Sequence, residues 1–179
     1  KLMAFDVCSS DLKLMAFDVD GVLTDGSLFY TDDGVEIKAF NTLDGHGLKM
    51  LQQGGVTVAI ITGRRARCVQ LRARNLGIGY LFQGVDNKLA VMNSLLVELG
   101  LTADVAGYMG DDLPDLPLMS ACGFSATPGD GHALVQSHAS LIATRWGGRG
   151  AVREVCEFIL EAQDKLAAVL APYLPVVER

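Results

Sequence analysis

The residues of this chain whose types and spacing could do chemistry begin with Asp18-Val19-Asp20-Gly21. An apolar run ends at Asp18, so a buried strand would present this carboxylate at the rim of a sheet. Gly21 allows a sharp turn that directs Asp20 toward the same space. Two carboxylates so close repel each other, which favours a bound cation or a shared proton. Taken alone, the segment is equally compatible with a strand end that carries two solvated acids.

Three further polar clusters each follow a run that predicts a strand or precede one that predicts a helix. They are Thr62-Gly63-Arg64, the segment before Lys88, and Gly110-Asp111-Asp112-Leu113-Pro114-Asp115. Each has an ordinary structural explanation: a strand-to-helix turn, a solvated lysine, and a helix N-cap that accounts for one aspartate but not for three. Their joint occurrence in this order favours a functional site.

The elements that must position these residues alternate between strand and helix. Apolar runs predict strands at residues 13–19, 56–61, 80–82, 105–109, 122–126 and 141–143. Periodic segments predict helices at 41–53, 65–76, 88–99 and 151–169, and a hairpin is expected at 27–40 around the turn 31–34. This alternation predicts an α/β fold with a parallel sheet and right-handed crossovers. Ligands of such sheets bind beyond the carboxyl ends of the strands, where all four clusters would meet.

Phosphoryl transfer is the chemistry that this set suggests. Asp18 is the candidate nucleophile, because a carboxylate can attack phosphorus and form an aspartyl phosphate. Asp20 would protonate the leaving alkoxide and then deprotonate the water that cleaves the intermediate.

The remaining candidates would stabilise charge. Asp18, Asp20 and Asp111 are the candidate ligands of a Mg²⁺ ion, which prefers oxygen ligands. The Thr62 hydroxyl and the Gly63 N–H would contact the phosphoryl group, and Lys88 would neutralise both the nucleophile and the phosphate.

Composition limits the functional class. The chain has 179 residues, of which 50% are hydrophobic, which suffices for one domain with a substantial core. A net charge of −6 argues against nucleic acid as the main partner. No apolar run reaches the ~18 residues of a membrane helix. Four cysteines without metal-type spacing are expected to be reduced thiols of a cytoplasmic protein.

The N-terminal segment repeats part of the chain. Residues 1–7 have the same sequence as residues 13–19, but Cys8 stands where the second copy has Asp20. We expect residues 1–12 to be a non-native duplicated leader, 13–168 to form the functional domain, and 169–179 to form a C-terminal tail.

The four clusters resemble the ordered motifs of haloacid-dehalogenase-like phosphatases, in which an aspartate at position 20 is the phosphatase form. Three further segments narrow the match: residues 41–47, Phe82-Gln83-Gly84, and the Gly-Gly-Arg-Gly-Ala-Val-Arg-Glu block at 147–154. They resemble the family of 3-deoxy-D-manno-octulosonate 8-phosphate phosphatases, and the resemblance covers about residues 14–166.

This resemblance implies a Rossmann-like, capless fold with helices on both faces of the sheet and a hairpin insertion after the first motif strand. It implies Mg²⁺-dependent hydrolysis of the eight-carbon sugar-acid phosphate, in lipopolysaccharide precursor biosynthesis. It also implies a homotetramer whose subunits share active sites. Asp112 and Asp115 would support the metal ligands. The substrate contacts implied are Asp20, Asn41, Thr42, Leu43, Asp44, Gly45, Lys49, Gly63, Arg64, Arg72 and Lys88.

Other functions stay open at this stage. A phosphatase for nine-carbon sialic-acid-type 9-phosphates would share these motifs. A receiver-like phospho-accepting domain also combines acids, a hydroxyl and a lysine, but its acidic pair normally closes the first strand. A non-catalytic domain descended from a phosphatase is disfavoured by the intact motif set.

Overall fold

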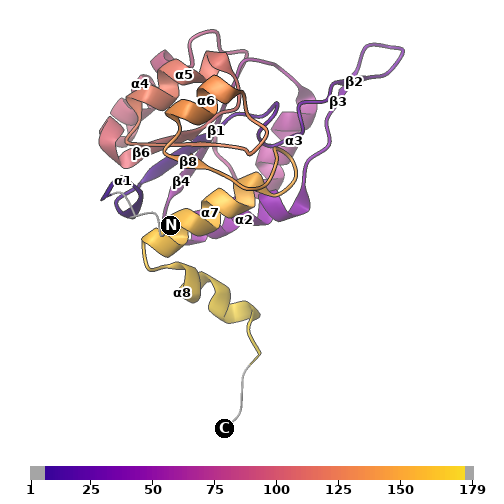
Figure 1. Cartoon of the computed structure of the whole chain (residues 1–179). Helices are drawn as coiled ribbons and strands as arrows, with labels where there is room; N and C mark the ends of the chain where they lie inside the picture. Colours follow the sequence, from indigo (N-terminus) through magenta and orange to yellow (C-terminus); the bar gives the residue numbers. More distant parts are fainter. Residues whose placement is uncertain (1–6, 176–179) are drawn as a thin grey trace.

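The computed structural model describes residues 7–175. A six-stranded parallel sheet forms the centre of the molecule (Figure 1). The strands lie in the order β5-β4-β1-β6-β7-β8, and every neighbouring pair is parallel. Their bounds are β1 (Leu14–Phe17), β4 (Thr57–Thr62), β5 (Tyr80–Gln83), β6 (Ala106–Met109), β7 (Phe124–Thr127) and β8 (Leu141–Ile142). The expected α/β, Rossmann-like sheet is confirmed.

Helices cover both faces of this sheet because successive strand residues point to opposite sides. In β1, Leu14 and Ala16 pack into one apolar cluster, whereas Met15 and Phe17 pack into the other, and all four are fully buried. The first cluster includes residues of α4 (Lys88–Leu99), α5 (Leu116–Ala121) and α6 (Ala133–His138). The second includes residues of α2 (Thr42–Gln53), α3 (Arg67–Leu76) and α7 (Ala151–Ala162).

Two asparagines fix where helices begin near the functional edge. The side chain of Asn41 accepts a hydrogen bond from Leu43 N (2.8 Å) at the start of α2. The side chain of Asn87 accepts one from Ala90 N (3.0 Å), so α4 begins at Lys88. These caps satisfy amides that have no partner within the helix.

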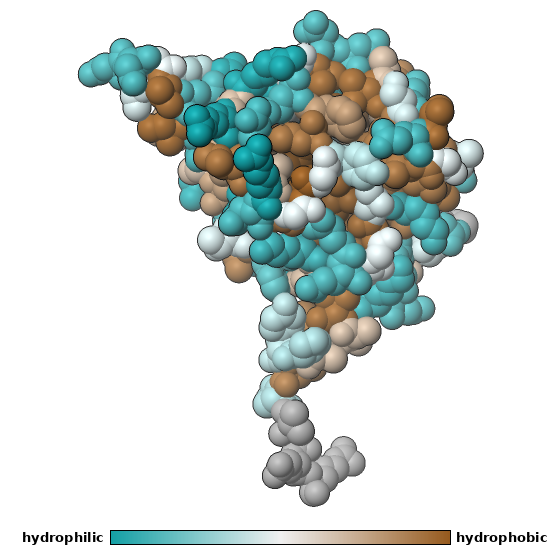
Figure 2. Space-filling model, turned by 180° about the vertical axis from the view of Figure 1, so that it is seen from behind, coloured by the Kyte–Doolittle hydropathy of each residue, from teal (hydrophilic) through white to brown (hydrophobic). Residues whose placement is uncertain are grey.

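The hairpin predicted at 27–40 forms a separate two-stranded antiparallel sheet that projects from the domain (Figure 1). Its strands, β2 (Phe29–Tyr30) and β3 (Glu36–Ile37), are shorter than the predicted runs. Gly34 takes a positive φ of 80° in the turn, which glycine adopts easily because it has no Cβ. The projecting arm carries hydrophobic surface (Figure 2), to which Phe29, Val35 and Ile37 contribute, each about half exposed.

The predicted C-terminal helix 151–169 is wrong in its length. α7 ends at Ala162, Asp164 has a φ of 54°, and α8 (Leu166–Leu170) starts in a new direction, followed by a 3₁₀ turn (Ala171–Tyr173). Side chains in the break bond to other elements: Gln163 donates to Leu12 O (2.9 Å) and Lys165 to Gly54 O (2.7 Å). The hydrophobic periodicity continues through the break, which is why the sequence pattern did not reveal it.

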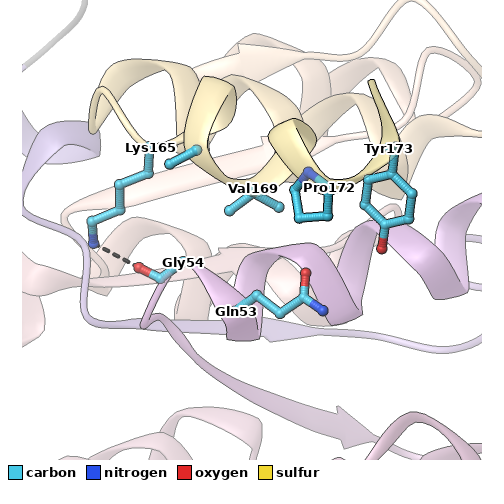
Figure 3. A pocket seen from close by; sticks show the side chains of 7 residues that line it. Gln53, Gly54, Lys165, Val169, Pro172 and Tyr173 are labelled. Atoms are coloured by element: carbon cyan, nitrogen blue, oxygen red, sulfur yellow. Dashed lines mark hydrogen bonds between the residues drawn. The ribbon is translucent and has the colours of Figure 1, made fainter. Parts of the chain in front are cut away.

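A cavity of about 560 Å³ lies between α2 and this C-terminal segment, lined by Gln53, Lys165, Val169, Pro172 and Tyr173 among others (Figure 3). The tail predicted at 169–179 is described as far as residue 175, and residues 176–179 lie outside the described part.

At the other terminus, residues 1–6 also lie outside the described part, and α1 (Val7–Ser10) precedes the sheet. Leu12 is 1% exposed and belongs to the same cluster as Met15. The boundary of the duplicated leader at residue 12 stays a prediction, although the packing of Leu12 makes the end of that segment part of the core.

The remaining short elements are two 3₁₀ turns, Ala103–Val105 and Leu113–Asp115. Within the described residues, no helix is long and apolar enough to span a membrane.

The apolar cluster that α2 and α7 share predicts a large effect of truncating one of its side chains. Leu51→Ala removes a fully buried side chain of α2, so we expect a loss of about 2–5 kcal/mol in the free energy of unfolding, measured by urea denaturation. Val97→Ala, at a position of α4 that is 83% exposed, is the control and should change stability by less than about 0.5 kcal/mol. Equal losses in the two variants would contradict this view of the core.

Candidate active site

The four sequence clusters line one pocket at the carboxyl edge of the sheet. Its volume is about 340 Å³, within the range typical of small-molecule sites. The loops that follow β1, β4, β5 and β6 supply its walls, as expected for parallel strands. The predicted residues among its lining are Asp18, Asp20, Thr62, Gly63, Arg64, Lys88, Asp111, Asp112 and Asp115.

Lys88 lies at the centre of the buried charges. Its Nζ donates to Asp18 Oδ2 (2.8 Å), to Asp115 Oδ1 (2.7 Å) and to the Tyr108 hydroxyl (3.1 Å). Burial alone would lower the pKa of Lys88, but the charges of Asp18 and Asp115 hold it above its usual value. Lys88 is therefore a fixed positive charge against the candidate nucleophile, and the solvated lysine that the sequence also allowed is excluded.

Asp115 fixes both Lys88 and the loop after β6. Its Oδ1 accepts hydrogen bonds from Lys88 and from the Tyr108 hydroxyl (2.9 Å). Its Oδ2 accepts hydrogen bonds from Asp111 N (3.0 Å) and Asp112 N (3.2 Å). Asp112 in turn caps the short 3₁₀ turn at Leu113 N (2.8 Å). This agrees with a supporting role for both aspartates, which stays a proposal.

The carboxylates of Asp18, Asp111 and Asp115 form a group that could hold a metal ion, with oxygens all within 4.8 Å of one another. Burial raises the pKa of Asp18 to about 6, an effect that Lys88 opposes. Burial, with the charges of Asp18 and Asp115, raises the pKa of Asp111 to about 8. Such mutual repulsion is what a divalent cation would relieve. Because Asp115 is already saturated by donors, Asp18 and Asp111 are the members with ligand capacity to offer.

Gly21 makes room for this carboxylate group. Its φ is 82°, and a Cβ at this position would overlap the Asp111 carboxylate. Glycine is therefore required both by the backbone conformation and by the close approach of Asp111. Any larger residue would displace a candidate metal ligand.

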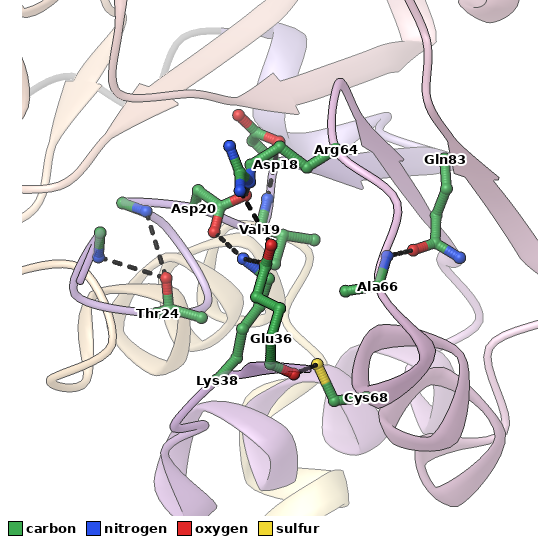
Figure 4. A network of polar contacts seen from close by, with 12 residues as sticks. Asp18, Val19, Asp20, Thr24, Glu36, Lys38, Arg64, Ala66, Cys68 and Gln83 are labelled. Atoms are coloured by element: carbon green, nitrogen blue, oxygen red, sulfur yellow. Dashed lines mark hydrogen bonds and ion pairs between the residues drawn. The ribbon is translucent and has the colours of Figure 1, made fainter. Parts of the chain in front are cut away.

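The side chain of Asp20 points to a different set of charges, as Figure 4 shows. Its Oδ1 pairs with Lys38 Nζ, and its Oδ2 lies 3.9 Å from Arg64 Nε. Glu36 contacts both cations: Lys38 Nζ at 2.6 Å and Arg64 Nη2 at 2.8 Å. These hydrogen bonds, first with Arg64 and then with Lys38, lower the pKa of Glu36 to about 2. Asp20 lines the pocket but is not in the carboxylate group above, so its expected place among the metal ligands stays a prediction.

The predicted substrate contacts at the start of α2 lie outside this pocket. Asp44 is 1% exposed, and its oxygens accept hydrogen bonds from Gly150 N (3.2 Å) and Arg153 N (3.0 Å) at the start of α7. Arg72 donates to Asn41 O (2.9 Å) and lies over the Phe40 ring, beside Gly45. Direct contact of Asp44 with a substrate would require its bonds to α7 to open.

Three other predicted contacts in this region are accessible. Thr42, Leu43 and Lys49 are exposed on α2. Residues 41–45, Lys49 and Arg72 are not among the residues that line the pocket. Their contact with a substrate therefore stays a prediction.

Sequence reasoning missed Tyr108, Lys38 and Glu36. Tyr108 is fully buried within a predicted strand, and nothing in its run of apolar neighbours distinguishes it from a core residue. Glu36 and Lys38 share one face of a predicted strand at i and i+2, a polar pair that could have been noticed. The ion pair between Lys38 and Asp20 joins residues 18 positions apart, so the spacing in the sequence did not predict it.

The elevated pKa values predict how cation binding depends on pH. Folding raises the pKa of Asp18 and Asp111 above that of an ordinary aspartate, so the stability of EDTA-treated protein should fall as pH rises from about 4 to about 8. Mg²⁺ replaces the bound protons, so it should raise the melting temperature more at pH 8 than at pH 6.

Asp111→Asn is the matched variant for this measurement, because it removes one repelled carboxylate. It should abolish most of the Mg²⁺-induced rise and should stabilise the EDTA-treated protein at pH 8. A Mg²⁺-induced rise of the same size at both pH values, in wild type and variant alike, would contradict a cation at this carboxylate group.

Comparison with known proteins agrees with this geometry. No family model matches the sequence. The 3-deoxy-D-manno-octulosonate 8-phosphate phosphatase KdsC of Yersinia pestis is 45% identical over 158 residues, covering 88% of this chain and 84% of that protein. KdsC of Escherichia coli K12 is 44% identical over the same length.

Solved structures give the same result. A 3-deoxy-D-manno-octulosonate 8-phosphate phosphatase from Moraxella catarrhalis, in complex with magnesium, phosphate and KDO, is 41% identical and has a TM-score of 0.94, covering 97% of this chain and all of that one. A probable YrbI family phosphatase from Pseudomonas syringae is 50% identical with a TM-score of 0.92, covering 94% and 96%. The chain therefore belongs to the 3-deoxy-D-manno-octulosonate 8-phosphate phosphatase family of the haloacid-dehalogenase-like superfamily.

Proposed function

We propose that this chain is a Mg²⁺-dependent phosphatase that hydrolyses 3-deoxy-D-manno-octulosonate 8-phosphate to the free sugar acid and phosphate. The observation that carries the proposal is the pocket in which Asp18, Lys88 and Asp111 meet. Family membership supplies the substrate, and the geometry supplies a nucleophile held next to a fixed positive charge.

Asp18 is the nucleophile of the proposed reaction. Lys88 and Val19 N bond to separate oxygens of Asp18, at 2.8 Å and 2.7 Å, which fixes the direction of the carboxylate. An Asp18 oxygen attacks phosphorus and forms an aspartyl phosphate, while the sugar alkoxide leaves and takes a proton from Asp20. Water then attacks the phosphorus, gives its proton to Asp20 and releases phosphate from Asp18.

The other residues of the pocket stabilise the phosphoryl group. Mg²⁺, when bound by Asp18 and Asp111, would supply positive charge against the phosphoryl oxygens and the nucleophile. Thr62, the last residue of β4, and Gly63 line the same pocket, and their hydroxyl and N–H would donate to the transferring phosphoryl group. Arg64 at the rim offers a guanidinium for an anionic part of the substrate.

We also propose that the protein works as a homotetramer with shared active sites, in the cytoplasm. Support for the assembly comes from the projecting hairpin, which exposes Phe29, Tyr30, Val35 and Ile37. An exposed apolar strand edge favours pairing with another chain. Cys68, Cys122 and Cys156 are free thiols in the described part of the chain, as a reducing compartment requires.

Replacement of the nucleophile tests the mechanism. Asp18→Asn should abolish phosphate release while the protein stays folded, because the change is nearly isosteric and Asp115 still pairs with Lys88 (2.7 Å). Asp104→Asn, at an exposed position before β6, is the control and should retain activity. Turnover by Asp18→Asn near the wild-type rate, measured as phosphate release, would remove Asp18 as nucleophile.

A panel of substrates tests the proposed specificity. Phosphate release should be fastest from the eight-carbon sugar-acid 8-phosphate, slower from a nine-carbon sialic-acid-type 9-phosphate, and lost for both when EDTA removes the metal. Equal or faster turnover of the nine-carbon ester would replace the proposed substrate. Activity that persists in EDTA would contradict the role of Mg²⁺.

A further inference from the structure

A buried lysine of the hairpin arm contacts the proposed acid–base residue. The side chain of Lys38 is completely buried, although it follows β3 at the base of a projecting hairpin. Its Nζ donates a hydrogen bond to Asp20 Oδ1 and forms an ion pair with Glu36 Oε1, 2.6 Å away (Figure 4). Desolvation makes an unpaired lysine expensive to bury, so this position is held by its two carboxylate partners.

The two oxygens of Asp20 are in different environments. Oδ1 is taken by Lys38, whereas Oδ2 is buried and has no hydrogen-bond partner among the described residues. Arg64 Nε, at 3.9 Å, is too distant to hydrogen-bond with Oδ2. Asp20 lines the pocket, and Oδ2 is its carboxylate oxygen with an unused acceptor, so Oδ2 is the oxygen left to exchange a proton with a substrate bound there.

We propose that Lys38 is a positioning residue that holds Oδ1 of Asp20 and so presents Oδ2 for proton transfer. This inference rests on the proposed phosphatase function. In the first half-reaction, the Asp18–phosphorus bond forms and the phosphorus–alkoxide bond breaks, and the alkoxide oxygen takes the proton from Oδ2. In the second, water attacks phosphorus, the Asp18–phosphorus bond breaks, and the proton of the water returns to Oδ2.

Glu36 limits the electrostatic effect of the lysine on Asp20. The positive charge of Lys38 is shared with Glu36, whose other oxygen pairs with Arg64 at 2.8 Å. Lys38, Arg64, Glu36 and Asp20 together carry two positive and two negative charges, so the cations beside Asp20 are compensated only within this group of four. Rotation of Asp20 would require Lys38 to lose a partner while buried, which makes the observed orientation the stable one.

Leaving groups that differ in their need for a proton test this role. An alkoxide leaves only with a proton from a general acid, whereas nitrophenolate is a stable anion that leaves without one. The value of kcat/KM covers the steps up to formation of the phosphoenzyme and does not include its hydrolysis. Comparing kcat/KM for the sugar-acid phosphate and for p-nitrophenyl phosphate therefore isolates the proton delivered in the first half-reaction.

In the full-length protein, Lys38→Met should lower kcat/KM for the sugar-acid phosphate by about 10-fold or more, part of the 10²–10⁴-fold that general acid–base catalysis contributes. The value for p-nitrophenyl phosphate should stay within about 3-fold of wild type, because that ester needs no general acid. Asp20→Asn should show the same contrast. Lys38→Arg, which keeps a cation at this position, should recover much of the activity on the sugar ester.

Lys13→Met is the matched control, because Lys13 is exposed and lies before β1, and it should leave both esters unchanged. Equal losses on the two esters in Lys38→Met, or no loss on either, would overturn the inference. If circular dichroism shows that Lys38→Met does not fold, Lys38→Gln replaces it. The same comparison of kcat/KM for the two esters then tests the role of Lys38. A wild-type protein that hydrolyses neither ester would instead contradict the proposed function.

Discussion

The ion pairs of one buried lysine with two carboxylates are the interaction on which this structure depends. Lys88 bonds to Asp18 and Asp115, which come from loops after different strands, at 2.8 Å and 2.7 Å. Without a cation between them, these two acids and Asp111 would repel one another. Burial in the pocket further disfavours the charged forms of Asp18 and Asp111. Lys88 supplies this cation from the first residue of α4, because Asn87 caps the helix immediately before it. The position of a helix start thus fixes the electrostatics of the site.

Parts of the chain far from the site hold its loops in place. Residues 147–150 pack against the loop that follows Asp20, so closely that a Cβ at Gly147 would overlap the backbone of Gly21. Gly148 N donates to Val22 O (2.9 Å), and Asp44 anchors the start of α7 behind this contact. Substrate contact by Asp44 stays a prediction, and its hydrogen bonds to Gly150 N and Arg153 N give it a structural role in this chain. It joins α2 to the segment that supports the first catalytic loop.

The sequence predicted what local pattern and strand order control, and it failed where long-range contacts decide. Alternating runs revealed the parallel sheet, and the order of the clusters placed Asp18, Lys88 and Asp111 in one pocket. Neither α5 nor α6 was predicted as an element, because each has only six residues and so shows too little hydrophobic periodicity. The break after α7 depends on Gln163 and Lys165, which bond to residues more than 100 positions away. Tyr108 and Lys38 were missed for the same reason, since only the folded chain shows their partners.

In the proposed function, the two sides of the hairpin would link catalysis to assembly. Its outer residues, among them Phe29 and Val35, are about half exposed, whereas Lys38 and Glu36 reach back to Asp20 and Arg64. Two strands of two residues each cannot hold such an arm in one position, because an isolated hairpin is at best marginally stable in water. The ion pairs at its base therefore restrain the arm from within. In the proposed tetramer, burial of its apolar outer surface would restrain it from outside, so that association would also fix the lysine that orients Asp20.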